Sequence, residues 1–166
     1  AFADSSRAQY DALKAEAHQA QAAGDLLAAE AKYTELLGVA ERIRPGAYEV
    51  HANVVTPLAD LYRKTEQPDK VEQLYTRRIE RAFRSRAEDG LELGLAQADL
   101  GFLYQNGDVS ADRFHGERYV ESAMKTFEQW GDSKNAGEQC RRRLADTAGI
   151  QGAIFFQQLD YRSAEP

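Results

Sequence analysis

The sequence predicts an all-α fold in which helical hairpins pack side by side in a row. Alanine-rich segments carry apolar residues at intervals of three and four, which is the spacing of one helix face. No alternating run of Val, Ile and Thr is long enough to predict a strand. Small residues recur at a nearly constant interval, because Ala17, Ala59, Gly101 and Ala145 lie 42, 42 and 44 residues apart. A small residue at this position lets the two helices of a hairpin approach closely.

The interval divides one domain, 1–166, into four units at about 8–45, 48–87, 89–131 and 134–162. Each of the first three units contains two apolar stripes with helical spacing. Turns between the stripes are predicted at Gly24-Asp25, at 67–69 and at 106–108, where Gly, Pro, Asn and Asp cluster. The chain is therefore expected to contain successive helical hairpins.

The fourth unit departs from this pattern. Residues 149–152, which begin and end with glycine, separate an apolar segment ending at Ala148 from a second one beginning at Ile154. The polar residues that follow are typical of a terminal capping unit.

Pro57 lies inside the first stripe of the second unit, and two interpretations are open. Thr56 could cap a helix that begins at Pro57. Alternatively, one longer helix from about Tyr48 could be kinked at the proline. The apolar stripe that runs back to Val50 favours the kinked helix.

The second unit resembles the 42-residue tetratricopeptide repeat of kinesin light chains and many bacterial proteins. The resemblance rests on residues 58–62 and 71–75, with residues 29–33 at the same phase in the first unit. Glu66 departs from the pattern, since it stands where the turn glycine is usual.

The third unit resembles the related Sel1-like repeat, over roughly residues 96–136. The matching residues are Leu100, Gly101, Tyr104, Asn106, Gly107, Val109, Asp112, Tyr119, Ala123, Gly131 and Ala136. Both resemblances imply a right-handed α-solenoid, with three to four stacked hairpins here. They also imply a protein–protein interaction module that binds a peptide or partner segment in a concave groove.

In tetratricopeptide arrays, the exposed side of each unit's first helix lines that groove. The resemblance therefore implies a partner-binding surface at matching positions of this chain. Phe102 would be the apolar anchor of an otherwise polar surface. The predicted groove residues are Lys14, His18, Asn53, Asp60, Arg63, Lys64, Phe102, Gln105, Asn106, Arg142 and Asp146.

An alternative function is assembly through the C-terminal helix. Ile154, Phe155 and Phe156 form an apolar patch that is expected to be covered, either in a homodimer or by docking into a larger complex.

Charge and motifs argue against several other classes of protein. A net charge of -6 and a pI near 5.2 argue against a nucleic-acid partner. No apolar run approaches the roughly 20 residues of a membrane span. The histidines lack metal-site spacing, Cys140 stands alone, and no nucleotide or nucleophile motif occurs. We therefore expect neither enzyme activity nor a cofactor or metal.

Two further patterns have simple explanations. The loop from Asn106 to Asp112, followed by Glu117, resembles a calcium-binding loop only weakly, because Ala111 replaces the turn glycine. The basic run between Arg77 and Arg86 lies near a predicted helix end, where cations interact favourably with the helix dipole.

The N-terminal residues bear on location. Ala1-Phe2-Ala3-Asp4 resembles the small-x-small end of a secretory signal. This predicts an exported, periplasmic protein, with a cytoplasmic location as the alternative.

Overall fold

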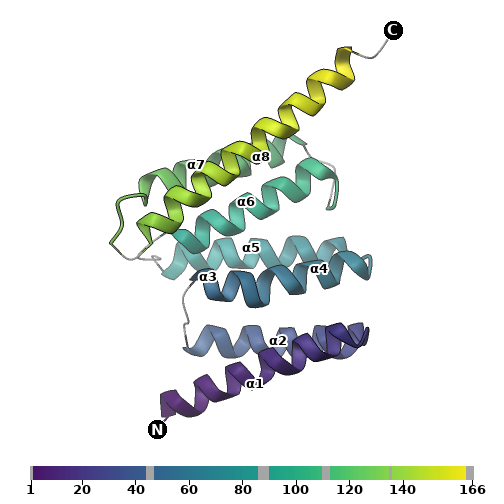
Figure 1. Ribbon diagram of the computed structural model, residues 1–166, viewed down its shortest axis with the longest axis vertical. Helices are drawn as coiled ribbons and strands as arrows, with labels where there is room; N and C mark the ends of the chain where they lie inside the picture. The colour runs from purple at the N-terminus through teal and green to yellow at the C-terminus, as the bar shows by residue number, and fades with distance from the viewer. Residues whose placement is uncertain (1, 44–46, 86–89, 110–112, 135, 164–166) are drawn as a thin grey trace. The chain divides into compact units, whose positions relative to one another are not determined.

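A computed structural model describes residues 2–43, 47–85, 90–109, 113–134 and 136–163 (Figure 1). In these ranges the chain is all-α, as predicted, and forms seven helices without a strand. One of the seven is continuous through three labelled segments, α3, η1 and α4. The elements are α1 (Phe2–Ala22), α2 (Leu26–Ile43), α3 (Ala47–Val50), η1 (His51–Val55), α4 (Thr56–Lys64), α5 (Pro68–Ser85), α6 (Leu91–Asn106), α7 (Arg113–Gln129) and α8 (Gly137–Ser163).

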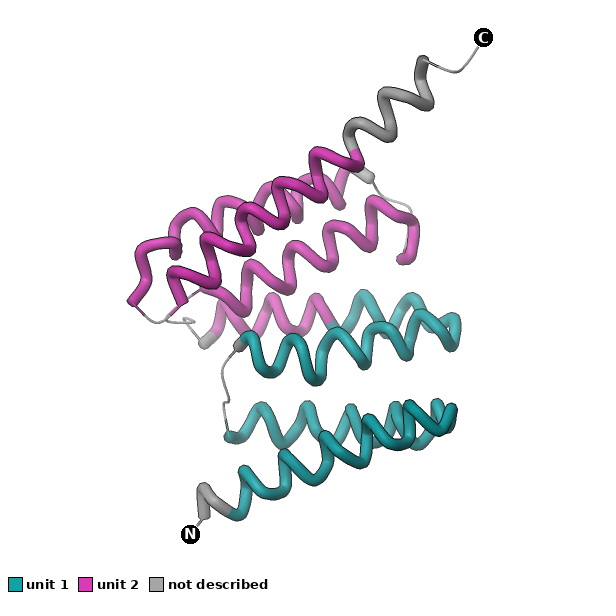
Figure 2. Tube along the Cα trace, in the orientation of Figure 1, with its two compact units in different colours: residues 1–74 teal, residues 75–166 magenta. Residues whose placement is uncertain are grey.

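The chain divides into two compact units, residues 1–74 and 75–166, with the boundary inside α5 (Figure 2). In the first unit, α1 packs antiparallel against α2, and α2 also contacts η1 and α4. Its core is apolar and almost fully shielded from solvent. The largest buried side chains there are Tyr10, Tyr33, Leu36, Val39, Val54, Val55, Leu58, Leu61 and Val71.

In the second unit, α6 packs antiparallel against α7, and α8 contacts both helices. Ten of the sixteen residues of α6 are buried, so this helix is covered on most of its circumference. A helix surrounded in this way needs apolar residues on all sides rather than one stripe. Phe127 on α7 and Cys140 on α8 complete the core around it.

The α6–α7 contact depends on two glycines. A Cβ atom on Gly101 would lie 2.6 Å from Val120 Cγ2 and 2.9 Å from the carbonyl oxygen of Gly116. A Cβ atom on Gly116 would lie 2.8 Å from the carbonyl oxygen of Gly101. The close approach predicted for Gly101 is therefore confirmed, and Gly116 is its counterpart on the facing helix.

The other small residues of the 42-residue interval differ from one another. Ala17 and Ala59 are buried, as expected for residues at a helix contact. Ala145 is exposed, so the prediction that it lies at a close helix contact is wrong. The reason is that α8 is not followed by a second helix within the described residues.

Turn chemistry defines the hairpins. Gly24 adopts a φ of +77°, and the carboxylate of Asp25 accepts a hydrogen bond from the backbone N–H of Ala28 at 3.0 Å, capping α2. Gly107 ends α6 with a φ of +76°. Between α4 and α5 the turn lies at 65–67, slightly before the predicted 67–69, because Pro68 already begins α5.

Pro57 lies inside one longer helix, as the second of the two interpretations of the sequence predicted. Thr56 has helical φ and ψ of -61° and -50°, and its N–H donates to the carbonyl oxygen of His51, so the interpretation of Thr56 as an N-cap is wrong. The preceding turn widens into a π-helix at His51–Val55. Pro57 lacks an N–H and crowds the turn before it, and a wider turn accommodates that loss within a continuous helix.

The C-terminal segment is a single helix, so the expected break at residues 149–152 is wrong. α8 continues through Gly149 and Gly152 for 27 residues. Each glycine inside a helix costs only about 1 kcal/mol relative to alanine. This cost is too small to stop a helix whose neighbouring turns are intact.

We expect Gly101→Ala to lower the free energy of unfolding by about 1–3 kcal/mol, because the added methyl group must displace α7. Urea denaturation followed by circular dichroism measures the change. Gly38→Ala is the control, since nothing lies within 4 Å of a Cβ at that helical position and the variant should gain about 0.5–1 kcal/mol. Equal effects of the two substitutions would contradict the close contact.

Glu66 has a φ of +55°, a conformation that costs a residue with a side chain about 1–2 kcal/mol. We expect Glu66→Gly to raise the free energy of unfolding by about 0.5–1 kcal/mol, after subtraction of the extra chain entropy of glycine. Glu35→Gly, inside α2, should instead lower it by about 0.5–1 kcal/mol. Urea denaturation measures both changes. A loss of stability in Glu66→Gly would contradict the left-handed conformation of residue 66.

Candidate interaction surface

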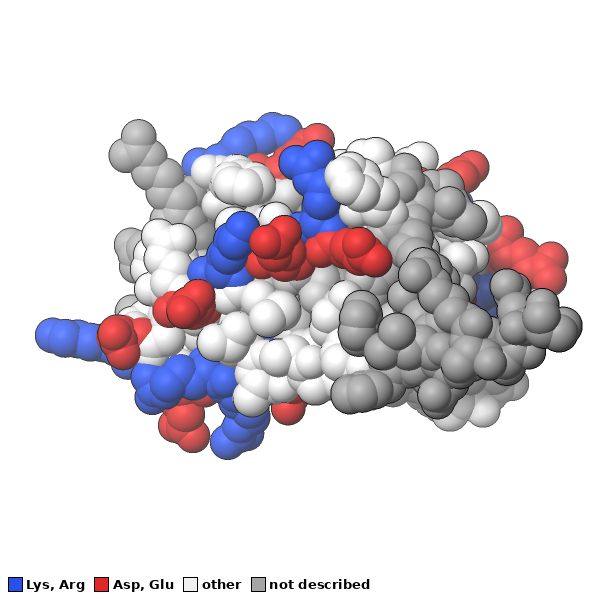
Figure 3. Space-filling model, turned by 90° about the horizontal axis from the view of Figure 1, so that it is seen from above, with Lys and Arg blue, Asp and Glu red and all other residues white. Residues whose placement is uncertain are grey.

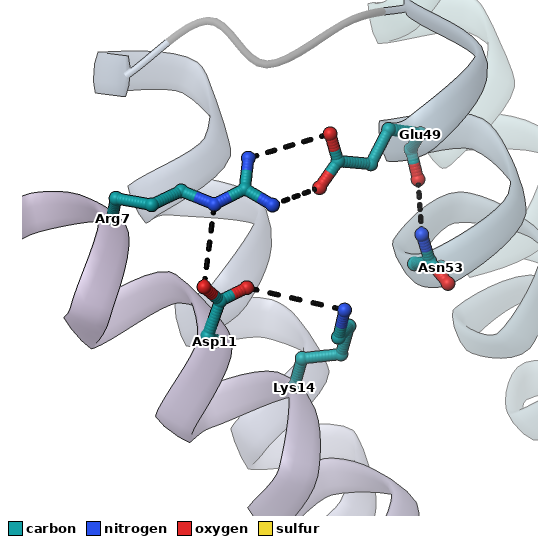
Figure 4. Close-up of polar contacts among 5 residues, drawn as sticks. All are labelled: Arg7, Asp11, Lys14, Glu49 and Asn53. Atoms are coloured by element: carbon teal, nitrogen blue, oxygen red, sulfur yellow. Dashed lines mark hydrogen bonds and ion pairs between the residues drawn. The ribbon is translucent and has the colours of Figure 1, made fainter.

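Five polar side chains of the first unit form a connected cluster at the surface between α1 and the α3–η1 segment (Figure 4). Arg7 donates to both carboxylate oxygens of Glu49, at 2.8 and 3.4 Å, and to Asp11 at 3.3 Å. The Nζ atom of Lys14 lies 3.9 Å from Asp11. The side-chain amide of Asn53 donates to the backbone carbonyl of Glu49 at 3.0 Å. We refer to these residues as the polar cluster.

Arg7 organises the polar cluster. Its planar guanidinium group binds Glu49 in a two-pronged geometry and lies 5.2 Å from the centre of the Tyr10 ring. The hydrogen bonds that Arg7 donates to Glu49 and then to Asp11 raise the pKa of Arg7 above its ordinary value. The charges remain accessible to water, with side-chain exposures of 48% for Arg7 and 30% for Glu49. Such a pair orients side chains more than it stabilises the fold.

Tyr10 lies directly beneath the polar cluster and is fully buried. Its hydroxyl has no hydrogen-bond partner among the residues that the structure describes. Burial, followed by the negative charge of Glu49, raises the pKa of the phenol to about 12. Tyr33, the other large tyrosine of this core, differs because its hydroxyl donates to the side-chain oxygen of Gln21 at 2.7 Å.

The predicted groove residues of the first compact unit, residues 1–74, lie on α1, η1 and α4. Lys14 and Asn53 both belong to the polar cluster, on opposite helices (Figure 4). His18 is exposed, with its ring 6.0 Å from that of Tyr33. On α4, Arg63 pairs with Asp60 at 3.3 Å, and Lys64 is exposed.

The predicted groove residues of the second compact unit, residues 75–166, lie on α6 and α8. Phe102 is partly buried rather than exposed. The side-chain amide of Gln105 donates to Gln151 at 3.1 Å, which links α6 to α8. Asn106 is exposed at the end of α6. On α8, Arg142 lies 3.5 Å from Glu138 and Asp146 lies 3.8 Å from Arg143.

The face seen in Figure 3 carries basic and acidic side chains interspersed with uncharged ones. Among the described residues seen there, charges of both signs lie near one another and neither sign predominates. Such a surface suits specific polar contacts better than long-range attraction of a highly charged partner.

Three members of the polar cluster, Arg7, Asp11 and Glu49, were not among the predicted site residues. One signal could have found them, because Arg7 and Glu49 are 42 residues apart, the same interval as Ala17 and Ala59. Positions one interval apart are candidates for lateral contact in a helical repeat.

The prediction that the basic run on α5 consists of cations near a helix end is wrong for Arg78. Arg78 is buried, with 5% of its surface exposed, and its guanidinium lies 2.5 Å from the carboxylate of Glu92 on α6. It therefore joins two helices inside the second unit and is not a solvated end-of-helix cation. Arg84 fits the prediction of a cation near the helix end, because it is exposed in the last turn of α5 and pairs with Glu80 at 3.0 Å.

Two other predicted sites fall partly outside the described side chains. Ile154 is partly buried on α8, while the side chains of Phe155 and Phe156 lie outside the described set. Residues 110–112 of the loop compared with a calcium site also lie outside it. Among the described residues, no three His, Cys, Asp or Glu side chains come together in a way that could hold a metal ion.

We expect Tyr10→Phe to raise the free energy of unfolding by about 1 kcal/mol at neutral pH, because it removes a buried hydroxyl that gains no hydrogen bond. Tyr33→Phe should lower it by about 1 kcal/mol, because it removes a hydrogen bond. Denaturation in urea compares the two variants.

The same variants carry a pH test. The phenol of Tyr10 ionises near pH 10 when unfolded and near 12 when folded, so its contribution to stability is lost as the pH rises from 10 to 12. The wild type should lose more stability than Tyr10→Phe across this range. Parallel losses would contradict the raised pKa.

None of the described helices combines the length and apolar character that a bilayer span requires. Comparison of the chain with family models, curated proteins and solved structures found no match.

Proposed function

We propose that this chain is a protein-interaction module of the tetratricopeptide or Sel1-like kind, whose first helices bind a peptide or partner segment. The observation that carries the proposal is the Arg7–Glu49 pair, which joins α1 to α3 across 42 residues. A lateral contact between the first helices of neighbouring hairpins, one interval apart, is expected of stacked repeats.

The helix boundaries add support. α1, α4 and α6 end at Ala22, Lys64 and Asn106, which are 42 residues apart in each case. α2 and α5 each contain 18 residues, and their first residues, Leu26 and Pro68, have the same separation. The interval thus applies to the helix ends as well as to the small residues. α8 departs from the interval, because it begins at Gly137 and α6 begins at Leu91.

The chemistry of the first helices suits a polar peptide. Lys14 makes no hydrogen bond among the described residues, and His18 and Lys64 are exposed. Asn53 has one amide hydrogen bond to Glu49 and retains a side-chain oxygen that can accept another. Because Arg7 and Glu49 orient each other, Lys14 and Asn53 stand beside a fixed pair of charges. A partner with carboxylate and amide groups would find complementary donors there.

Within this proposal the module is non-enzymatic and exported, with a cytoplasmic location as the alternative. Binding in the proposed mode uses hydrogen bonds and charge pairs from the protein alone, so it requires neither a cofactor nor a metal. The proposed partner is a protein or peptide, and the net charge of -6 makes nucleic acid a poor ligand.

A second candidate function is self-association through α8. No atom of the described residues lies within 4 Å of the positions that a Cβ would occupy on Gly149 and Gly152, and Ile150 is 48% exposed. The sequence from Thr147 to Leu159 contains no charged residue. A helix that exposes an uncharged, partly apolar segment gains free energy when another helix covers it.

We expect a peptide selected from a random phage-displayed library against the chain to perturb the backbone NMR signals of Lys14, His18 and Asn53. Lys14→Ala should weaken its binding at least about fivefold, which corresponds to roughly 1 kcal/mol. Fluorescence anisotropy of the labelled peptide measures affinity, and two-dimensional NMR locates the contact.

Lys32→Ala is the matched control, because Lys32 lies on α2, is partly exposed and pairs with Glu16 at 2.6 Å. Its peptide affinity should remain at the wild-type value. Perturbations confined to α2 and α5 would exclude the first helices as the binding surface.

Light scattering behind a sizing column separates the second candidate from the first. Self-association through α8 requires a wild-type dimer and a folded Phe155→Asp monomer. Monomers in both samples would remove this candidate and leave peptide binding unaffected.

A further inference from the structure

Aromatic side chains form a connected series from the core of the second unit to its surface, at the loop end of the α6–α7 hairpin. Tyr104 is buried at the end of α6 and stacks on Tyr119 of α7, with ring centres 5.9 Å apart and an angle of 4° between the rings. The ring of His115 lies 6.5 Å from Tyr104 and 6.3 Å from Phe114. The guanidinium group of Arg118 lies 5.9 Å from the centre of the Phe114 ring.

Phe114 is the outer member of this series and is 67% exposed. Its ring meets His115 edge to face, and the guanidinium carbon of Arg118 lies 5.9 Å from its centre, so its position on α7 is supported from two directions. A large aromatic ring that is held in place but left in water loses little conformational entropy when a partner covers it.

Arg118 differs from six other arginines of this protein. Arg7, Arg63, Arg78, Arg84, Arg142 and Arg143 each pair with a carboxylate. Arg118 is exposed and has no ion pair or hydrogen bond within the described part of the chain. Glu121, one turn along α7, pairs with Lys125 at 3.1 Å instead. The donors of Arg118 therefore remain available, on a guanidinium group that lies over the Phe114 ring.

We infer that Phe114 and Arg118 form a docking site for an acidic peptide segment that places a carboxylate beside an apolar side chain. The guanidinium fork matches the two oxygens of a carboxylate, and the exposed phenyl ring supplies the apolar contact. Neither group alone specifies this ligand, because a lone cation attracts any anion and a lone ring attracts any apolar group. Because the two groups lie 5.9 Å apart, a ligand must place its carboxylate and its apolar side chain about one side-chain length from each other.

This site is separate from the surface proposed above. Phe114 and Arg118 lie on α7, the second helix of its hairpin, whereas the proposed groove lies on first helices. The two proposals can therefore fail independently.

The test uses a fluorescein-labelled hexapeptide of alternating Leu and Glu, amidated at its C-terminus, and the matching peptide of Leu and Gln. The Leu–Glu peptide should bind and perturb the backbone NMR signals of residues 114–119, and the Leu–Gln peptide should bind at least about tenfold more weakly. Arg118→Gln should also weaken the Leu–Glu peptide about tenfold, as expected when one charge-assisted contact is removed. Phe114→Ala should weaken both peptides.

Arg77→Gln is the matched control, because Arg77 is also an exposed arginine, lies on α5 and changes the net charge by the same amount. It should leave the affinity within about twofold of the wild type. Equal weakening by Arg77→Gln and Arg118→Gln would reduce the effect to general electrostatic attraction and overturn the proposal. So would signal changes confined to the first helices, or no binding of the Leu–Glu peptide.

Discussion

The structure depends on how closely paired helices can approach along their buried sides. At the α6–α7 contact, Gly101 and Gly116 face each other, and a methyl group on either would meet the backbone of the other helix. Side-chain volume at such a point sets the distance between helix axes, and that distance decides which larger side chains can interlock nearby. Val120 and Phe127 are fully shielded in the same contact. The glycines thus allow the large residues of both helices to be buried.

Polar groups inside the second unit connect helices where apolar packing alone would leave orientation loosely defined. Arg78 pairs with Glu92, the hydroxyl of Tyr75 donates to Asp99 at 3.0 Å, and that of Thr126 donates to Gln97 at 3.0 Å. A buried polar group without its partner is costly, so each pair penalises a sliding or rotation of its helices. These three contacts join α6 to α5 on one side and to α7 on the other.

Much of the fold was predictable from the sequence. Helical spacing and turn residues predicted the all-α class and the hairpin turns at Gly24 and Gly107, because a local pattern determines those features. The continuity of α8 and the exposure of Ala145 were not predictable, because both depend on whether another helix covers the segment. Glu66 shows the same limit, since its left-handed conformation follows from the turn and not from a preference of glutamate.

The candidate surface was predictable only in part, for a related reason. The resemblance to tetratricopeptide repeats implies which positions of the first helices face a partner, and Lys14 and Asn53 are two of them. It does not indicate which exposed charges pair with each other. Arg7 and Glu49 bind each other, whereas Arg118 lies 5.9 Å from the centre of the Phe114 ring and has no ion pair among the described residues. A charge that is already paired must first lose its partner before it can bind another group, so an unpaired donor can bind a ligand at a lower cost in free energy.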